Sequence, residues 1–408
     1  MKISIIGSGS GGFAMAAYLT SLGHEVCVFS KSMQENDSFH LKVSGIINNK
    51  FKIKIINNDY NELVKYSNLI LVVTTADAHA KIAKKISKYL SSEKIVILTP
   101  GKVFGSLEFY KIINQLSGKT PYVAETNTLL FAAKKINYDT VEIYGKKDQV
   151  CIASYPSKNI LFINKIIKKI FHQYLIKANT LYTAVNNIGS ILHPPIFLEK
   201  SLISPSIENK SFYLNIDEKS EKMVLKLDNE RIDIAKKLNI KTPSLVNWFE
   251  NVYGIQPLKG LKNILNNDIY NKIKINNAKV SRYLFEEIPY GLIPLIELGN
   301  FLDLKMSNMI KICNKSKKFL SPSMLSSART FKNLNLKKNE LIDMINNESN
   351  ISVLSHLGKI VNYVNYKNNM NQEPQILQSS NNRSIEDLGL NTDWINDFVK
   401  KQTLDSVK

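Results

Sequence analysis

A run of glycines close to the N-terminus has the spacing of a phosphate-binding loop. Gly7, Gly9 and Gly12 occupy the first, third and sixth positions of a G-x-G-x-x-G pattern, directly after the first expected strand at residues 3–6. In such a loop the first glycine permits a tight turn, the second lets the backbone approach a pyrophosphate, and the third lets a helix pack closely on a strand. The amide groups that open the following helix then point at the phosphates. We expect Gly7, Gly9, Ser10 and Gly12 to contact a dinucleotide.

The end of the second expected strand bears on which dinucleotide is bound. An NAD-specific site usually carries a carboxylate there, which accepts hydrogen bonds from the ribose hydroxyls. Here the chain reads Phe29-Ser30-Lys31-Ser32, without an acid. Ser30 and Ser32 can donate hydrogen bonds and Lys31 can neutralise a 2′-phosphate, so the sequence favours NADPH and leaves NADH as the second option. The plainer alternative is that Lys31 is a solvated loop residue.

One of the six histidines, His193, stands where a helical pattern meets two prolines, Pro194 and Pro195. Proline lacks a backbone N–H, so we expect the helix to end there. Because the ordinary pKa of imidazole is near neutrality, a histidine can accept or donate the proton that accompanies hydride transfer. A histidine that is only satisfied by hydrogen bonds at a helix end is the alternative.

Two different hydrophobic patterns along the chain predict which elements position these residues. In the first half, short runs rich in valine and isoleucine alternate with helical patterns, which is typical of βα units on a parallel sheet. Strands are expected at residues 3–6, 25–29, 69–73 and 94–98, and helices at 13–22 and 78–90. Farther on, apolar residues fall at helical spacing over the segments 218–238, 243–252 and 292–302. The sequence predicts an α/β protein with an N-terminal Rossmann-type parallel sheet, residues 1–182, and a mostly α-helical C-terminal domain, residues 183–408.

Charge and cysteine content argue against several classes of protein. The formal net charge of +19 could attract polyanions, but the lysines are scattered through helical patterns, as at Lys81, Lys84, Lys85 and Lys88, which is typical of a solvated helix face. We therefore expect no nucleic-acid partner. No apolar run is long enough to cross a bilayer, so no membrane partner is expected. Three scattered cysteines without metal-ligand spacing indicate neither a disulfide framework nor a metal site, and favour the cytoplasm.

Several segments carry a likeness to a known family, in their order as well as their content. They read TPGKVFGSLE at 99–108, ETNTL at 125–129, HPPIF at 193–197, LDNER at 227–231 and RYLFEEIPYGL at 282–292. Together they resemble the opine dehydrogenase family, the octopine and nopaline dehydrogenase group, from Met1 to about Leu336. The segment at 193–197 is also similar to that of metallophore-making relatives.

The resemblance implies an enzyme that condenses a 2-oxo acid with the amino group of an amino acid or other amine, and reduces the C=N bond with NAD(P)H. It implies that His193 is the catalytic acid/base and that Arg282 anchors a substrate carboxylate, with catalysis in a cleft between the two domains. Glu287 falls where the family usually has the aspartate that pairs with the catalytic histidine. That is a departure, because one extra methylene changes the geometry of the pair.

Alternatives remain open at this stage. The main rival is reduction of a simple 2-oxo acid or a phosphorylated ketone without an amine partner, which the same scaffold can support. A second rival is a redox-sensing dinucleotide-binding protein with a basic surface for nucleic acid. Asp228, Glu230 and Arg231 are interpreted as structural ion pairs, and Glu125, Thr126 and Thr128 as residues near a strand end that could face a ligand. Neither the oxo acid nor the amine is identified, and a homodimer is one option for the assembly.

Overall fold

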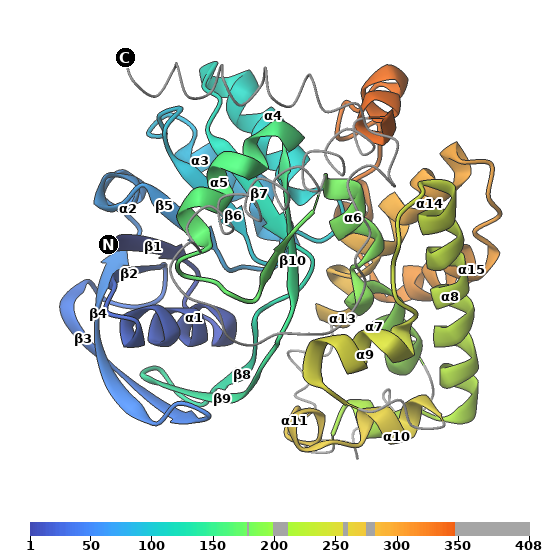
Figure 1. Ribbon diagram of the computed structural model, residues 1–408, viewed down its shortest axis with the longest axis horizontal. Coiled ribbons are helices and arrows are strands. Elements are labelled where there is room, and N and C mark those ends of the chain that lie inside the picture. The colour runs from blue at the N-terminus through green and yellow to red at the C-terminus, as the bar shows by residue number, and fades with distance from the viewer. Residues whose placement is uncertain (178, 199–210, 256–259, 275–281, 347–408) are drawn as a thin grey trace, which may run out of the picture. The chain divides into compact units, whose positions relative to one another are not determined.

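The computed structural model describes residues 1–177, 179–198, 211–255, 260–274 and 282–346 (Figure 1). All of them belong to one compact unit, Met1–Ser352. Residues 347–408 of the predicted C-terminal domain lie outside the described part, and the boundary predicted at residue 182 stays a prediction. No helix of the described residues is long and apolar enough to cross a membrane.

Strands of the first half of the chain form a single sheet. They are β1 (Lys2–Ile6), β2 (Glu25–Ser30), β3 (Asn36–Gly45), β4 (Asn49–Asn57), β5 (Leu69–Val72), β6 (Ile95–Leu98), β7 (Tyr122–Thr126), β8 (Phe131–Lys135), β9 (Thr140–Lys146), β10 (Val150–Tyr155) and β11 (Tyr174–Ile176). Their order in the sheet is β11-β10-β7-β6-β5-β1-β2-β4-β3-β9-β8. The central strands β7-β6-β5-β1-β2-β4 pair in parallel, which confirms the predicted Rossmann-type sheet.

The strand order reverses at β1, which places the glycine-rich loop at a binding crevice. From β1 the chain goes to β2 on one side and later returns to β5 on the other side of β1. Open α/β sheets bind ligands at the carboxyl ends of strands where the order reverses. A β-carbon on Gly7 would lie 2.3 Å from the carbonyl oxygen of Val73, just after β5, and Gly7 has φ +126°. Only glycine fits this turn.

Antiparallel pairs that the sequence analysis did not predict extend the sheet. β3 pairs with β4, β8 with β9, and β10 with β7. In β4 the buried Phe51, Ile53 and Ile55 alternate with more exposed lysines at 50, 52 and 54. Such alternation is the signal of a half-buried strand, so the β3–β4 hairpin was readable from the sequence.

Helices cover the sheet and then gather into a separate core (Figure 1). Those between strands are α1 (Ser10–Ser21), α2 (Tyr60–Tyr66), α3 (His79–Ile86), α4 (Gly105–Ser117) and α5 (Ile160–Ile167). Those of the second half are α6 (Thr180–Val185), α7 (Ile188–Leu198), α8 (Glu218–Lys237), α9 (Leu245–Tyr253), α10 (Leu261–Leu265), α11 (Asp268–Asn271), α13 (Arg282–Phe285), α14 (Ile293–Phe301), α15 (Ser307–Ser316) and α16 (Pro322–Ser326), with a π-helical turn at Ile288–Leu292. The predicted mostly α-helical second part is confirmed.

The helix that carries His193 corrects one expectation. We expected it to end at Pro194, but α7 runs through Pro194 and Pro195 as far as Leu198. Both prolines are buried, as are Ile196 and Phe197 that follow them. Burial of this apolar turn in the helical core outweighs the lost backbone hydrogen bonds, since tertiary packing routinely overrides local helix propensity.

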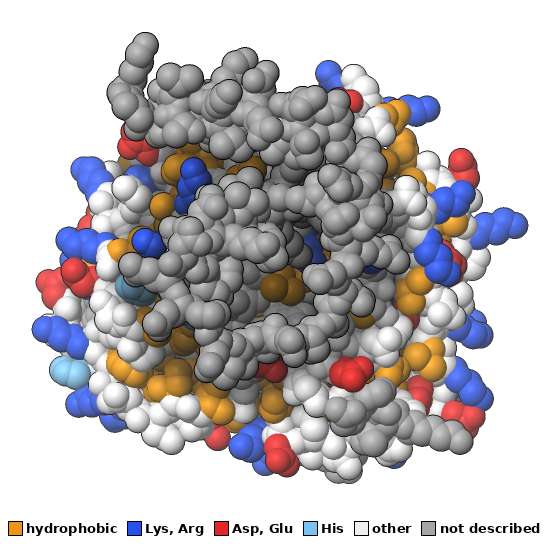
Figure 2. Space-filling view, in the orientation of Figure 1, with side chains coloured by type: hydrophobic (Ala, Val, Ile, Leu, Met, Phe, Trp, Pro, Cys, Tyr) orange, Lys and Arg blue, Asp and Glu red, His pale blue; other side chains and the backbone are white. Residues whose placement is uncertain are grey.

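The lysines of helix α3 lie on its solvent-exposed face. The lysines at 81, 84 and 85 in α3, and Lys88 just after it, are exposed. Ile82, Ala83 and Ile86 of the same helix are buried. This pattern confirms the interpretation of a solvated helix face. On the face shown in Figure 2, Lys and Arg side chains are dispersed among acidic and apolar ones wherever the surface is coloured.

Helix α8 is tied to its neighbours by buried charged side chains that serve the fold. The fully buried Arg231 donates from Nε to Asp228 (2.8 Å) and from its other nitrogens to the carbonyls of Val185 (2.9 Å) and Pro243 (2.6 Å). This confirms the structural interpretation for the pair. Glu230 acts differently from the expected ion pair, because it accepts from the backbone N–H groups of residues 308 and 309 at the start of α15.

We expect Arg231→Met to lower the free energy of unfolding by about 3–5 kcal/mol, because it leaves the Asp228 carboxylate buried without its partner. The matched control is Lys236→Met on the same helix, which removes an exposed ion pair to Asp233 (3.3 Å) and should cost less than about 1 kcal/mol. Urea unfolding followed by circular dichroism measures both. Equal destabilisation of the two variants would contradict a structural role for Arg231.

Candidate active site

One cavity of about 900 Å³ is lined by residues from both predicted groups, although Gly12, Ser30, Lys31 and Ser32 are not among its lining residues. Gly7, Gly9 and Ser10 of the glycine-rich loop line it, and so do His193, Arg282 and Glu287 of the helical part. Among the other lining residues are aromatic side chains: Tyr213, Trp248, Tyr253, Tyr270 and Tyr283. A cavity of this size fits an extended ligand that spans from the loop to the histidine.

The glycine-rich loop has the features that a dinucleotide pyrophosphate requires. Helix α1 begins at Ser10, three residues before the expected start, and its N-cap Gly9 provides no side-chain cap. The first-turn amides are therefore not capped by a side chain, and a helix N-terminus of this kind attracts phosphate. A β-carbon on Gly12 would lie 1.8 Å from the carbonyl oxygen of Gly7, so only glycine lets the helix start so close to β1. The loop fits the cofactor.

The three residues expected to contact the ribose lie at the carboxyl end of β2. Ser30 is buried, and its hydroxyl lies 2.8 Å from that of Ser8 in the glycine-rich loop. Its oxygen also accepts from the backbone N–H of Ser32 (3.3 Å). Lys31 and Ser32 are exposed, and Lys31 makes no ion pair with a described residue. Ser30 thus stabilises the turn that follows β2. The charge of Lys31 is not engaged by a described residue and is available for a ligand.

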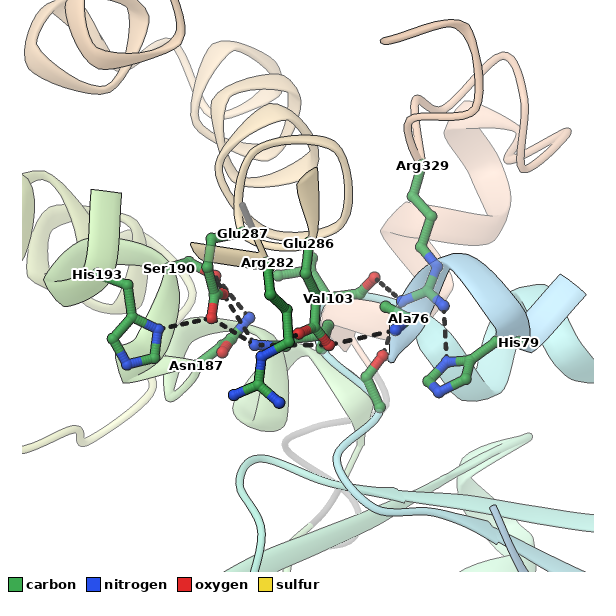
Figure 3. A network of polar contacts seen from close by, with 12 residues as sticks. Ala76, His79, Val103, Asn187, Ser190, His193, Arg282, Glu286, Glu287 and Arg329 are labelled. Carbon is green, nitrogen blue, oxygen red and sulfur yellow. Dashed lines mark hydrogen bonds and ion pairs between the residues drawn. The ribbon is translucent and has the colours of Figure 1, made fainter. Parts of the chain in front are cut away.

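His193 and Glu287 form a hydrogen-bonded pair. Nδ1 of His193 lies 2.8 Å from Oε1 of Glu287 (Figure 3), so the longer side chain at the departure position still reaches the imidazole. Because a carboxylate only accepts hydrogen bonds, the proton of a neutral imidazole resides on Nδ1. The other nitrogen, Nε2, then accepts from the hydroxyl of Tyr213 at 3.0 Å. This leaves Nε2 as the atom of His193 that can exchange a proton on the cavity side.

Two glycines make room for this pair. A β-carbon on Gly189, one turn before His193, would lie 2.9 Å from Oε1 of Glu287. A β-carbon on Gly291 in the π-helical turn would lie 2.0 Å from the hydroxyl oxygen of Ser190. That hydroxyl donates to Oε2 of Glu287 (3.0 Å), so the close approach of α7 to the π-helical turn is what lets Glu287 bind two residues of α7.

Arg282 lies at the start of α13 with its side chain about half exposed (47%) in the cavity wall. Among the described residues its ion pair is a long one, 3.7 Å from Nε to Glu286. Figure 3 shows its guanidinium directed away from Glu287. Glu286 is held separately, because it accepts from the backbone N–H of Ala76 (3.2 Å). The planar end of Arg282 therefore remains available for a carboxylate.

Lys102 is a site residue that the sequence analysis did not single out. It follows β6 and its Nζ lies 2.8 Å from both carboxylate oxygens of Glu287. Its side chain is buried and also lines the cavity. The two residues are 185 positions apart in the chain, so no local spacing could have joined them.

The cluster has a definite charge state. Burial raises the pKa of the Glu287 carboxyl. The charge of Lys102 and the hydrogen bonds from His193 and Lys102 lower this pKa by more than burial raises it, so the net pKa is far below its usual range. Burial lowers the pKa of His193, Glu287 opposes that shift in part, and the charges of Lys102 and Arg282 add to it, with a net lowering. Glu287 is therefore ionised and His193 neutral at pH 7.

Glu125 and Thr126, which could have faced a ligand, serve the fold instead. Glu125 is fully buried, and its carboxylate accepts from the backbone N–H of Ser106 (2.6 Å) and from the hydroxyl of Thr183 (2.5 Å). Thr126 donates to the carbonyl of Thr128 (2.9 Å). Of these three residues at the end of β7, Thr128 lines the cavity. Among the described residues no cluster of side chains has the composition of a metal site.

Known proteins resemble both parts of the chain that line this cavity. Residues 176–320 match the family model described as NAD/NADP octopine/nopaline dehydrogenase, alpha-helical domain, and residues 2–99 match that of NADP oxidoreductase coenzyme F420-dependent. The chain is 27% identical to an opine dehydrogenase of Arthrobacter sp. (strain 1C) over 292 residues, 70% of this chain and 81% of the relative.

Solved structures show the same fold. Octopine dehydrogenase in complex with NADH and agmatine superposes with a TM-score of 0.63 at 16% identity, over 82% of this chain and 95% of that one. Yersinopine dehydrogenase with NADP+ bound superposes with a TM-score of 0.59 at 12% identity, over 86% and 99%. The chain thus combines a Rossmann domain with a helical part that matches the octopine and nopaline dehydrogenase model, and it is similar to an opine dehydrogenase along most of its length. These likenesses support an NAD(P)-dependent oxidoreductase that acts on CH–NH bonds.

Proposed function

We propose that this protein reduces the C=N bond formed between a 2-oxo acid and the amino group of an amino acid or amine, with NADPH as the preferred reductant and His193, Glu287 and Arg282 as its catalytic residues. The observation that carries the proposal is the shared cavity, in which the dinucleotide loop and the His193–Glu287 pair line the same space. A protein that only sensed the dinucleotide would not need an ionised acid and a neutral histidine buried on the far wall.

The residues of the site can perform the proton transfers of such a condensation. Amino acids carry a protonated amino group, which must lose a proton before it can attack the carbonyl carbon of the oxo acid. Neutral His193 can accept that proton at Nε2, where it replaces the hydrogen bond from Tyr213. Burial keeps the pKa of Tyr213 far above its usual range, so the phenol stays protonated throughout.

The protonated imidazole then becomes the acid of the second half of the reaction. It returns its proton to the hydroxyl that leaves as water when the C=N bond forms, and the ionised Glu287 stabilises it in the meantime. Arg282 holds a substrate carboxylate and fixes the orientation of the reacting carbon. The bound dinucleotide supplies the hydride that reduces this carbon. His193 thus acts first as a base and then as an acid, which is the acid/base role that the resemblance implies.

The function test is the amine requirement. We expect NADPH oxidation with a 2-oxo acid to depend on an added amino acid or amine, and the product to have the mass of the two substrates minus water plus two hydrogens. Absorbance of NADPH and mass spectrometry of the product, over a matrix of oxo acids and amines, measure this. Oxidation at the same rate without any amine would contradict the proposal and favour simple oxo-acid reduction.

We expect His193→Ala to lower kcat by about 10²–10⁴-fold with NADPH affinity unchanged, because it removes the proton acceptor but leaves the loop intact. Arg282→Ala should instead raise KM for the carboxylate substrate, since its charge is engaged before the transition state. Steady-state kinetics with fluorescence titration of NADPH separate the two effects. Full turnover by His193→Ala would show that the role taken from the family is wrong.

For cofactor choice we expect Lys31→Glu to lower kcat/KM for NADPH by about 10–100-fold relative to NADH, because a charge-assisted hydrogen bond to the 2′-phosphate is worth about 1.5–3 kcal/mol. Lys84→Glu makes the same charge change on the exposed face of α3 and serves as the control. Specificity constants for both cofactors measure the ratio. If the two variants shift it equally, Lys31 does not read the phosphate.

A further inference from the structure

The loop between β6 and α4 is held in an unusual backbone conformation around Lys102. Lys102 has φ 62° and Phe104 has φ 60°, both in the left-handed region that non-glycine residues rarely adopt. Such conformations persist where the surroundings fix them, and they concentrate at functional sites. This backbone conformation directs the side chain of Lys102 toward Glu287, to which its ammonium group donates.

Arg329 clamps the loop on both sides of Lys102. Its Nη1 donates to the carbonyl of Gly101 (2.7 Å) and to that of Val103 (3.2 Å), the residues that flank Lys102. Arg329 is fully buried and is itself fixed by Glu108 (2.8 Å from Nε) and by His79 (3.0 Å from Nη2), as Figure 3 shows in part. These contacts fix the backbone on both sides of Lys102 and so fix the position of its side chain.

Lys102 uses half of the acceptor capacity of Glu287. An ionised carboxylate has about four lone-pair positions. Oε1 takes His193 and Lys102, and Oε2 takes Lys102 and Ser190. The ammonium group of Lys102 and the imidazole of His193 therefore contact the same oxygen of Glu287. The positive charge of Lys102 offsets the negative charge of Glu287, so the carboxylate stabilises a protonated imidazole less strongly.

We propose that Lys102 is a positioning residue of the reaction: by sharing the Glu287 carboxylate with His193 it keeps the imidazole neutral in the free enzyme, ready to accept the proton of the incoming amine. The inference rests on the proposed function for its purpose, while the charge state itself can be measured without turnover. Without the lysine, Glu287 would act on His193 alone and would stabilise the protonated imidazole before any substrate had arrived.

The titratable and charged groups around His193 come from several elements, and each bears on this balance. Glu287 favours the protonated form, and Lys102 and Arg282 oppose it. Glu286 lies 4.0 Å from Lys102, and the rings of Tyr213 and Tyr283 flank the imidazole. Of these, Lys102 is the cation in direct contact with the partner of His193, and Arg282 points away into the cavity.

The test is the titration of His193 by NMR in the complete protein, with ¹³C-labelled histidine and the resonance assigned by its loss in His193→Ala. We expect Lys102→Met and Lys102→Gln to raise the midpoint by about 1–2 pH units, the effect of removing a neighbouring positive charge. Lys102→Arg, which keeps the charge, should leave it within a few tenths of the wild-type value. Lys111→Met, which removes the ion pair of another lysine with Glu340 (2.7 Å), is the matched control and should not move it.

The pH profile gives the second readout. Because kcat/KM for the amine requires neutral His193, it should rise with pH through the His193 midpoint, and this rise should move to higher pH by the same amount in Lys102→Met. Below the wild-type midpoint the variant would then be about 10–100-fold slower than wild type, and it would recover at alkaline pH. A lysine needed only for folding would lower activity equally at every pH.

The results separate the two proposals. His193 midpoints that coincide in Lys102→Met, Lys102→Gln and Lys111→Met overturn the role of Lys102, whatever the enzyme turns over. An enzyme that reduces an oxo acid without an amine overturns the proposed function, yet leaves the measured shift of His193 to decide the charge balance. Thermal unfolding and NADPH binding of each variant establish that the folded protein is compared.

Discussion

The carboxylate of Glu287 is the group on which the arrangement of this site depends. It is a buried negative charge, and such a charge is tolerated only when hydrogen bonds and opposite charges surround it. Here its donors come from α7, through His193 and Ser190, and from the loop after β6, through Lys102. One carboxylate therefore joins the nucleotide-binding half of the chain to the helical half at the point where both line the cavity.

Several local features are explained by that requirement. Gly189 and Gly291 lack side chains where a β-carbon would collide with Glu287 or Ser190. The left-handed backbone at Lys102 is held by Arg329, and the apolar residues Val103 and Phe104 next to it pack into the helical core. The loop after β6 thus belongs to the packing of the second half although it lies in the first half of the sequence.

The sequence predicted those parts of the fold whose signals are local. The glycine spacing and the apolar strands located the nucleotide-binding half, because a tight turn, a phosphate site and a buried parallel strand each leave a short pattern. Alternation in β4 was equally local and was overlooked. The path of α7 through Pro194 was not predictable from propensity, because burial of the surrounding turn decides it. The cysteines Cys27, Cys151 and Cys313 are free, but location in the cytoplasm and a homodimer stay predictions.

The site was predictable only in part, and the reason is geometric. His193 was singled out by its place before two prolines, whereas Arg282 and Glu287 were found through the family resemblance, and the structure brings all three to one cavity. Lys102 lay within a matching segment, yet its meaning depends on a contact across 185 residues. That contact also explains how a glutamate is accommodated at 287, where the resemblance led us to expect an aspartate. An aspartate would withdraw the carboxylate by about one carbon–carbon bond, roughly 1.5 Å, which is too far to keep His193, Ser190 and both oxygens on Lys102 at hydrogen-bond distance without movement of the backbone. The longer side chain and the lysine that it meets therefore have to be understood together, as one solution to placing a negative charge beside a neutral histidine.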